Sequence, residues 1–504
     1  MSPPRSTPWD LSPEAEIEAF ERLKPRLRDL WALVFPRDDE PYTSVVVPSV
    51  TLEPASLRRL SGVLHVEETL LFLLIRLRNP RARIVYLTSQ PIPPPVLEYY
   101  LQFLAGIPGS HARARLTLLS AYDASLRPLT EKILERPRLL ERIRAAIPDP
   151  SRAYLTVFRS TPLERRLAVL LGIPLNAADP GMEALCTKSG GRKVLREAGI
   201  EQPLGREDVR SEGEVLDALL ELRARRPGLR RAVLKLDRSQ WDEGHALYTY
   251  PESEDPASLG RSLRQLALSV PESAESYLER LETGGGIVEE FIEGVRATAS
   301  AQVRINPLGS VVLTSTHDEI RGGPTGMAGL GALFPADESY RRRVQDLSLR
   351  IGHVFAEKGL VSRLSVEFLV CEPEGEREPR LLASEVNLGV GGSTHPLLAV
   401  RFLCGGELDP RSGLFFSPRG RPKFYRVTDH LPCPRLRGLL PEDLIEILTL
   451  NHLHYSHRTE SGVLFYMLGA LSETGRVGML AVGNSRWEAD QVFQHTLDVL
   501  EACL

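Results

Sequence analysis

Two apolar segments that each hold one carboxylate constrain this chain most, and both lie within Leu364–Pro396. The first reads LSVEFLV with Glu367, and the second reads LLASEVNLGVGGSTHP with Glu385 and Asn387. On a strand, residues two apart share a face, so the side chains of Glu385 and Asn387 leave the same side. An unpaired buried carboxylate is costly, so we expect a cation there, and oxygen ligands of this kind suit Mg²⁺. The alternative is that these residues only end an exposed edge strand.

Length and composition indicate a globular protein with several domains. The 504 residues suffice for about three domains, and contents of 42% hydrophobic and 25% charged residues are typical of globular chains. A net charge of −4 argues against a nucleic-acid partner. The N-terminus lacks a signal-peptide pattern, and the longest apolar run, Leu70–Ile75, is far shorter than the ~20 residues that span a bilayer. Five cysteines without a C-x-x-C pair fit a reducing compartment, so we expect a cytoplasmic protein without a membrane partner.

Lysine is rare in this chain, which makes each lysine informative. Only seven of the 62 basic residues are lysines, although a compact ammonium and a planar guanidinium do different chemistry. Lys188 stands just before a glycine turn and a predicted helix, where a phosphate could meet both an ammonium and backbone N–H groups. Lys235 interrupts the apolar predicted strand RAVLKLD. The alternative for both lysines is an ordinary surface position near the end of a strand or helix.

The order of predicted elements divides the chain into four parts. Residues 1–42 form an extension with helical periodicity over residues 13–34. Residues 43–180 alternate strands and helices, which predicts a parallel sheet covered by helices, a Rossmann-like layer, but no G-x-G-x-x-G motif that would bind a dinucleotide. Residues 181–405 hold Lys-containing elements, an antiparallel meander and both carboxylate strands. Residues 406–504 predict a separate small α/β domain.

The chemical motifs follow one another as lysine, lysine, hinge strand, Glu and Glu-x-Asn. In this order the chain resembles the ATP-grasp superfamily, and within it the pheganomycin-type peptide ligases. The resemblance runs from about residue 43 to the end and rests on TSQPIPPPVLEYYL, KSGGRKVLREAGI, STHDEI, LFPA and EVNLGVGGSTHP. It implies an α/β fold, α+β in its core, with an N-terminal Rossmann-like pre-ATP-grasp domain, an ATP-grasp nucleotide-binding and catalytic domain, and a small C-terminal α/β domain.

The resemblance also implies which residues bind ATP. Lys188 and Lys235 match the two lysines that hold the ATP phosphates, and Gly244 is the glycine of the loop that would cover these phosphates. Glu289 matches the acidic residue at the start of the adenine hinge, whose backbone would contact the adenine edge. The hinge supplies the remaining cofactor-binding residues: Glu290, Ile292 and Glu293. The alternative for Glu290 and Glu293 is that their side chains only face solvent.

Glu367, Glu385 and Asn387 match the ligands of two Mg²⁺ ions that bridge the β- and γ-phosphates. In such enzymes the γ-phosphate passes to a substrate carboxylate, and an amine then attacks the acyl phosphate. Catalysis then depends on positioning and charge neutralisation rather than on a covalent protein nucleophile. The resemblance therefore implies an ATP- and Mg²⁺-dependent carboxylate–amine ligase that forms an amide or peptide bond and releases ADP and phosphate. Its partners would be small-molecule or peptide substrates, and it could form a homodimer.

Several positions depart from the family's pattern. Many ATP-grasp ligases have an arginine two residues after the metal-binding asparagine, where this chain has Gly389. The loop after the second lysine is poor in glycine, and Glu319 stands where relatives have an amide. Losing one placed charge at a developing anion costs roughly 10²–10³ in rate. The candidate catalytic residues that could replace the arginine are Arg321, which we prefer, Arg304 and His395.

Two other functions stay open at this point. The departures favour a non-catalytic protein that kept the nucleotide-binding fold and lost turnover. A third hypothesis is a ligase that works only with a carrier or partner protein that presents its substrate. A cation that reaches the space beyond the γ-phosphate would favour the ligase, and the sequence names neither the acid nor the amine.

Overall fold

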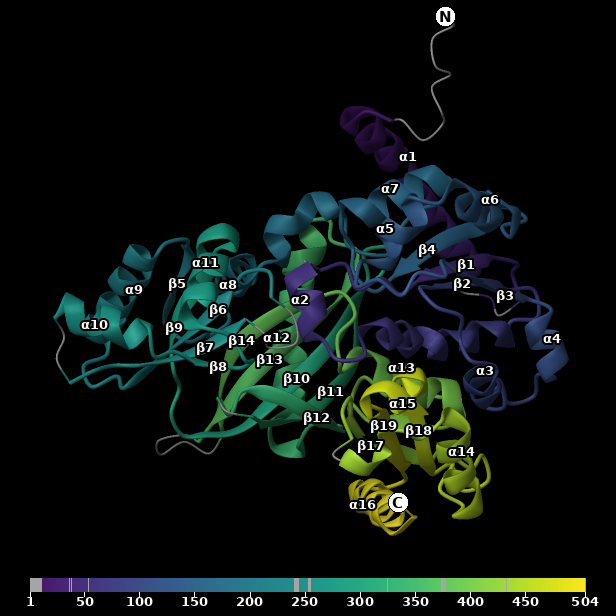
Figure 1. The fold of residues 1–504 in the computed structure, drawn as a ribbon. Coiled ribbons are helices and arrows are strands. Elements are labelled where there is room, and N and C mark those ends of the chain that lie inside the picture. Colours follow the sequence, from purple (N-terminus) through teal and green to yellow (C-terminus); the bar gives the residue numbers. More distant parts are fainter. Residues whose placement is uncertain are drawn as a thin grey trace, which may run out of the picture.

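The computed structural model of the protein describes residues 11–35, 37, 39–52, 54–239, 244–252, 255–323, 325–372, 378–431 and 433–503. They form a mixed α/β structure with one parallel sheet and two sheets of antiparallel pairs, which confirms the predicted fold class. The parallel sheet and the smaller antiparallel sheet lie at opposite ends of the molecule, with the large antiparallel sheet between them (Figure 1). Among the described residues, no helix has both the length and the apolarity needed to cross a membrane.

The first unit is a parallel sheet buried between helices. Its elements are α1 (Pro13–Val34), β1 (Thr43–Val47), α2 (Pro54–Arg59), η1 (Val63–Arg78), β2 (Arg83–Thr88), α3 (Pro94–Leu101), α4 (Gly109–Arg113), β3 (Leu116–Ser120), α5 (Leu129–Leu134), α6 (Pro137–Ala145), η2 (Pro150–Arg152), β4 (Ala153–Val157), α7 (Pro162–Leu171) and η3 (Pro180–Cys186). The strand order is β3-β2-β1-β4. Val46 packs into one core and Val45 and Val47 pack into another, because side chains of a strand alternate between faces. Both faces of the sheet are therefore covered, as a parallel sheet requires.

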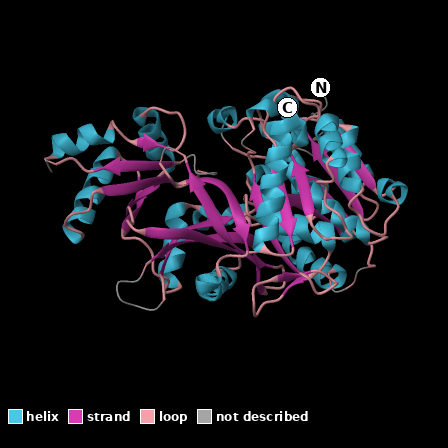
Figure 2. Cartoon of the chain, turned by 90° about the horizontal axis from the view of Figure 1, so that it is seen from below, coloured by secondary structure: helices cyan, strands magenta, loops and turns pink. Residues whose placement is uncertain are grey.

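The second unit is a five-stranded sheet in the order β5-β9-β6-β7-β8. It contains α8 (Lys188–Glu197), β5 (Gly205–Val209), α9 (Glu212–Arg225), β6 (Arg231–Leu236), β7 (His245–Thr249), α10 (Pro256–Leu263), β8 (Ala267–Leu268), α11 (Ala274–Gly284) and β9 (Gly286–Glu290). Leu234 and Leu236 of β6 enter the core beneath α9 and α11. Lys235 lies between them in sequence and so points to the opposite face. Figure 2 shows this unit projecting at the end away from the parallel sheet.

The large antiparallel sheet has one apolar and one polar face. Its central elements are β10 (Val295–Ile305), β11 (Val311–Gly322), β12 (Ala328–Phe334), α12 (Glu338–Glu357), β13 (Ser362–Cys371), β14 (Arg380–Leu388) and α13 (Thr394–Cys404). Val366 and Phe368 of β13 pack with α12 in a buried core. Glu367 alternates with them and leaves the other face, where it stands opposite Glu385 of β14. The two carboxylates are therefore cross-strand neighbours, as the sequence pattern predicts.

The C-terminal part shares this sheet. It consists of β15 (Glu407–Leu408), β16 (Phe415–Phe416), β17 (Pro422–Thr428), η4 (Pro434–Leu436), α14 (Pro441–Leu450), β18 (Gly462–Tyr466), η5 (Leu468–Ala470), α15 (Leu471–Thr474), β19 (Gly478–Gly483) and α16 (Arg486–Cys503). Strand β17 pairs with β12 on one side and with β19 on the other. Residues from 406 onward are thus hydrogen-bonded into the central sheet and are not attached only through a linker.

The junction between β12 and β17 predicts a sensitive position. A Cβ at Gly331 would lie 2.2 Å from the backbone O of Val427, so Gly331→Ala forces the two strands apart. We expect this substitution to destabilise the protein by roughly 1–3 kcal/mol and to lower the thermal unfolding midpoint. The matched control is Gly260→Ala in α10, because a Cβ there meets nothing within 4 Å. Equal midpoints for the two variants would contradict the structural role of this junction.

Candidate active site

The site forms where the N-terminus of α8 meets β6 and β14. Thr187 caps α8, and its hydroxyl accepts a hydrogen bond from the N–H of Gly190 at 2.9 Å. Two glycines follow because the helix start is crowded. A Cβ at Gly190 would lie 2.0 Å from the backbone O of Ala184, and a Cβ at Gly191 would touch Val386 of β14 at 3.4 Å. The KSGG motif therefore lets α8 approach β14 closely and places Lys188 at the helix start.

Lys188 links α8 to the carboxylate strand. Its ammonium is buried, forms an ion pair with Glu385, and donates a hydrogen bond to Oδ1 of Asn387 at 2.8 Å. Glu385 and Asn387 lie two residues apart on β14 and therefore present their oxygens to the same side. One lysine thus contacts both groups of the Glu-x-Asn motif.

Lys235 contacts the hinge strand. Its ammonium forms an ion pair with Oε1 of Glu289 at 2.6 Å and donates a hydrogen bond to the backbone O of Ser384 at 3.0 Å. Oε2 of Glu289 accepts from Arg192 Nη1 at 2.8 Å, and Arg192 also pairs with Glu207 at 2.9 Å. Arg192 lies one turn after the first lysine on α8 and therefore ties the helix to the five-stranded sheet.

Glu385 is the most heavily paired carboxylate of the site. Besides Lys188, His245 Nε2 lies 3.2 Å and Lys235 Nζ lies 3.9 Å from its Oε2. Burial favours its neutral form, but Lys188, His245 and Lys235 outweigh burial and hold the pKa of Glu385 well below its usual range. Burial also disfavours the charged form of Lys235, and the carboxylates Glu289 and Glu385 overcome this and raise its pKa. The centre is therefore ionised at neutral pH.

Glu367 faces the second candidate cation. Arg321 of β11 forms an ion pair with Glu367, and its Nη1 donates to the backbone O of Met327 at 2.8 Å. Glu319 of the same strand accepts a hydrogen bond from the hydroxyl of Ser300 at 2.5 Å. The preferred arginine candidate is therefore adjacent to the carboxylate pair.

The hinge residues differ in solvent exposure. Glu290 is buried rather than solvent-facing, and its backbone N–H donates to Leu204 O at 2.8 Å while its Oε1 accepts from Leu204 N–H at 2.9 Å. Ile292 is half-buried. Glu293 is exposed, and its side chain pairs with Arg231 at 2.6 Å.

The loop between β6 and β7 is described only at its two ends. The backbone O of Gly244 accepts from Leu236 N–H and from the Tyr277 hydroxyl, both at 3.0 Å. A Cβ at Gly244 would lie 2.2 Å from the Cβ of Ser239. Residues 240–243 lie outside the described residues. Gly244 therefore permits the tight return of the chain to β7.

The other two cation candidates lie elsewhere. Arg304 is four residues from Ser300, the cross-strand partner of Glu367, which is about 13 Å along β10. Its guanidinium donates to Asn176 Oδ1 at 2.5 Å. His395 is buried in α13, 3.8 Å from Asp429, and burial lowers its pKa, so it is a neutral ring. The structure therefore separates Arg304 and His395 from the lysine–carboxylate centre.

Sequence reasoning missed three residues of the centre: Arg192, Asp237 and His245. Asp237 accepts from the backbone N–H of Ser189 at 2.7 Å and from its hydroxyl at 3.1 Å, which anchors the start of α8. His245 follows Gly244 and stands opposite Lys235 in the β6–β7 register. Arg192 follows Lys188 by four residues, a spacing that places both on one face of a helix. Arginine is so frequent in this chain that this spacing alone does not distinguish Arg192 from other arginines.

The donor set fits magnesium. Glu367, Glu385 and Asn387 offer carboxylate and amide oxygens, which are the ligands that Mg²⁺ prefers. No cluster of three or more His, Cys, Asp or Glu side chains with metal-binding geometry occurs in the described part of the chain. Mg²⁺ at a nucleotide site needs only one or two carboxylates, because substrate phosphates and water complete its shell. The cations Lys188 and Arg321 hold the carboxylates in this structure.

Comparison with known proteins identifies the class. The chain is 30% identical over 463 residues to L-propargylglycine–L-glutamate ligase of Streptantibioticus cattleyicolor, covering 90% of this chain and 93% of that protein. It is 24% identical to IQ motif-containing protein H of Danio rerio, covering 78% of this chain but 42% of that protein. A family model described as "IQCH-like, ATP-grasp" matches residues 182–250, and one described as "PGM1 C-terminal domain" matches residues 443–496.

Solved structures agree on the fold. The chain superposes on an ADP complex of N5-carboxyaminoimidazole ribonucleotide synthetase with a TM-score of 0.52 at 12% identity, covering 92% of this chain and 98% of that chain. Biotin carboxylase of Campylobacter jejuni gives a TM-score of 0.54 at 12% identity, covering 91% of each chain. The chain therefore belongs to the ATP-grasp superfamily. It is an ATP-grasp ligase that forms carbon–nitrogen bonds, and the non-catalytic alternative is not favoured.

The buried network at Glu289 predicts that Arg192 contributes more to stability than its neighbour Lys193. Arg192→Met would remove the guanidinium that joins Glu289 to Glu207 and leave Glu289 with Lys235 as its remaining ion-pair partner. We therefore expect a loss of roughly 1.5–3 kcal/mol and a lower thermal unfolding midpoint. Arg192→Lys should not restore stability, because an ammonium cannot reproduce the fork of guanidinium contacts. The control is Lys193→Met, whose exposed 2.6 Å pair with Asp208 should contribute less than about 1 kcal/mol. Similar midpoints for the two methionine variants would contradict the role of Arg192.

Proposed function

We propose that this ligase activates a substrate carboxylate as an acyl phosphate and joins it to an amine, releasing ADP and phosphate. The observation that carries the proposal is the buried centre at Glu385, where two lysines from different elements contact one carboxylate. Each lysine is held beside oxygens that a nucleotide and its metal would engage. Such an arrangement suits phosphoryl transfer, which depends on positioning and on neutralising charge.

ATP binding would exchange the partners of the two lysines. Lys188 and Lys235 would turn from Glu385 and Glu289 to the phosphates, beside the start of α8, whose backbone N–H groups favour anions. Adenine would lie against the hinge at Glu290 and Ile292. Because the N–H of Glu290 already donates to the backbone O of Leu204, other backbone N–H and C=O groups of the hinge would contact the adenine edge. The exposed Glu293 would then lie at the rim of the nucleotide site.

Glu367, Glu385 and Asn387 would hold Mg²⁺, with two ions as our specific proposal. Bound magnesium would neutralise charge on the β- and γ-phosphates. Arg321 would turn from Glu367 toward the space beyond the γ-phosphate once the carboxylate has its metal partner. It would hold the phosphorylated carboxylate, a role that needs one placed positive charge.

The atoms of the reaction balance without a protein nucleophile. A carboxylate oxygen of the acid attacks the γ-phosphorus, the bond to the β,γ-bridging oxygen breaks, and ADP leaves. The amine nitrogen then attacks the acyl carbon, the C–O bond breaks, phosphate leaves with that oxygen, and the amine proton passes to solvent. Both steps are displacements, so neither requires an oxidant or a further cofactor.

The acid and the amine are proposed to be amino acids or short peptides. The named substrates of the Streptantibioticus relative are L-propargylglycine and L-glutamate, which supports amino acids as a class. We also propose that the protein works in the cytoplasm, since its five cysteines are free. A homodimer is proposed because a biotin carboxylase domain of the same fold is described as a dimer.

Nucleotide analysis tests the proposed reaction. Incubation with Mg·ATP and pooled amino acids should yield ADP and phosphate in equal amounts and only when the pool is present. Glu385→Ala should lower this rate by at least about 10²-fold, because the site loses its central anion and a metal ligand. Chromatography of the nucleotides and mass spectrometry of the products give the readout.

The control variant is Glu378→Ala, an exposed carboxylate between β13 and β14 whose loss should leave the rate unchanged. Formation of AMP in place of ADP would overturn the acyl-phosphate mechanism. ATP binding without consumption in any pool would overturn the proposed ligase activity of the chain alone.

A further inference from the structure

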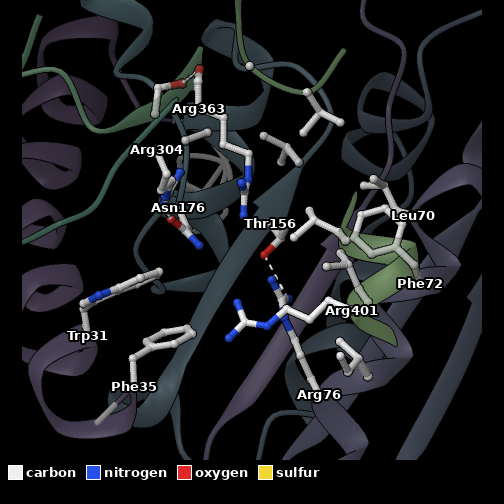
Figure 3. A pocket seen from close by; sticks show the side chains of 18 of the residues that line it. Trp31, Phe35, Leu70, Phe72, Arg76, Thr156, Asn176, Arg304, Arg363 and Arg401 are labelled. Carbon is white, nitrogen blue, oxygen red and sulfur yellow. Dashed lines mark hydrogen bonds between the residues drawn. The ribbon is translucent and has the colours of Figure 1, made fainter. Parts of the chain in front are cut away.

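A cavity of about 1260 Å³ lies between the first unit and one end of the large sheet. Elements far apart in sequence line it: α1, η1 and β4 from the first unit, β10 and β13 from the sheet, and α13. Figure 3 shows its interior. The volume exceeds that of the usual small-ligand pocket, so it has room for a substrate of amino-acid or peptide size.

Four arginines point into this cavity (Figure 3). Arg76 comes from the last turn of η1, Arg304 from β10, Arg363 from β13 and Arg401 from α13. Arg304 and Arg363 stand opposite each other in the register of β10 and β13. In the described part of the chain, none of the four forms an ion pair.

Neutral groups orient these arginines without cancelling their charge. Arg76 donates to the hydroxyls of Ser44 and Thr156, and its guanidinium lies 5.3 Å from the ring centroid of Tyr154. Arg304 donates to Asn176 and lies 5.4 Å from the ring centroid of Trp31. These contacts fix direction, whereas a charge removed from water normally gains an anionic partner.

The cluster is electrostatically unbalanced. Burial, with Arg363 and Arg76 nearby, lowers the pKa of Arg304 to about 9. Burial, with Arg76 and Arg401 nearby, lowers the pKa of Arg363 to about 10. Guanidinium groups that repel one another in a partly dry cavity are costly unless an anion joins them. A ligand with more than one negative charge would relieve the repulsion most fully.

The cavity adjoins the lysine–carboxylate centre. Leu388, Gly389 and Val390, which follow Asn387 directly, line it. Gly389 donates its backbone N–H to the backbone O of Arg363 at 2.8 Å, so the arginine lies beside the glycine on the neighbouring strand. Gly389 also has a φ of +103°, a conformation that strongly favours glycine. Arg363 and Gly389 are therefore neighbours on adjacent strands, and both line the same cavity.

Aromatic and apolar side chains also line the cavity, on two sides of the arginines (Figure 3). Trp31 of α1 and Phe35, the residue that caps this helix, stack with ring centroids 3.7 Å apart, and both line the cavity. Leu70 and Phe72 line it from η1. The cavity therefore combines a cluster of cations with a wall that excludes water, which strengthens the attraction between the arginines and an anion.

We propose that this cavity is the subsite for a substrate with two carboxylates, such as a dicarboxylic amino acid or a peptide that contains one. Arg363 and Arg304 bind the carboxylate next to Gly389, and Arg76 and Arg401 bind the second carboxylate. The inference deepens the proposed function and rests on it. It assigns the discrimination between an acid and its neutral amide to Arg401 and Arg76.

Calorimetric titration tests the subsite without turnover. L-glutamate, L-aspartate, L-glutamine and O-phospho-L-serine are titrated into the full chain, with and without Mg²⁺ and a non-hydrolysable ATP analogue. At least one dicarboxylic amino acid should bind at least about tenfold more tightly than L-glutamine. Arg401→Gln should remove that preference while leaving the affinity for the ATP analogue unchanged. The matched control is Arg411→Gln, an exposed arginine on a nearby turn, which should leave both affinities unchanged.

The side chain of Arg401 is solvent-exposed and faces the cavity. Arg401→Gln should therefore leave the thermal unfolding midpoint of the ligand-free protein unchanged. Equal affinities for L-glutamate and L-glutamine, or no binding of any dicarboxylic acid, would overturn the proposal. Tighter binding of O-phospho-L-serine than of both dicarboxylic acids would also overturn it in favour of a phosphate site. Acid-selective binding without ADP formation would contradict the proposed reaction and leave the subsite standing. ADP formation without a preference for dicarboxylic acids would contradict the subsite and leave the proposed reaction standing.

Discussion

The ion pair between Lys188 and Glu385 is the interaction on which the site depends. It joins Lys188, the first residue of α8, to the buried Glu385 of β14. Asn387 accepts a hydrogen bond from the same ammonium. Two glycines make this approach possible, because any side chain at Gly190 would collide with the backbone of Ala184. The contact is buried, so breaking it without a replacement partner would be strongly unfavourable. A ligand that supplies both an anion and a cation would replace it at low cost, and the metal–nucleotide complex that we propose carries both.

The same logic applies to the two sheets. The five-stranded sheet contributes Lys235, Glu289 and His245 from one face, and the large sheet contributes Glu367 and Glu385 from its polar face. Lys235 and His245 reach across the gap between the sheets to Glu385, and Lys235 also donates to the backbone of Ser384. Glu289 and Glu367 are paired within their own sheets, with Lys235 and Arg321 respectively. Further along the large sheet the balance changes, because the arginines at its far end have no acidic partners in the described residues. The polar face therefore runs from the charge-balanced lysine–carboxylate centre, where we propose that nucleotide binds, to a cationic pocket.

Much of this could be predicted from the sequence. The alternation of apolar residues around Glu367 and Glu385 predicts their shared face, and the β13–β14 register bears this out. The scarcity of lysine singled out both lysines of the centre. The arginine cluster could not be predicted in the same way, because arginine is common throughout and because Arg76, Arg363 and Arg401 meet only through the packing of three distant segments. The pairing of β17 with β12 was also beyond the sequence, since edge contacts between distant strands leave no local pattern.

Oxygen transfer tests the central claim most directly. Once the acid substrate is known, it is prepared with ¹⁸O in its carboxylate and converted to the amide in the presence of Mg·ATP and the amine. An acyl phosphate requires that one labelled oxygen leaves with the phosphoryl group, so the account predicts phosphate carrying one ¹⁸O and unlabelled ADP. Label in AMP, or unlabelled phosphate alongside amide product, would contradict it.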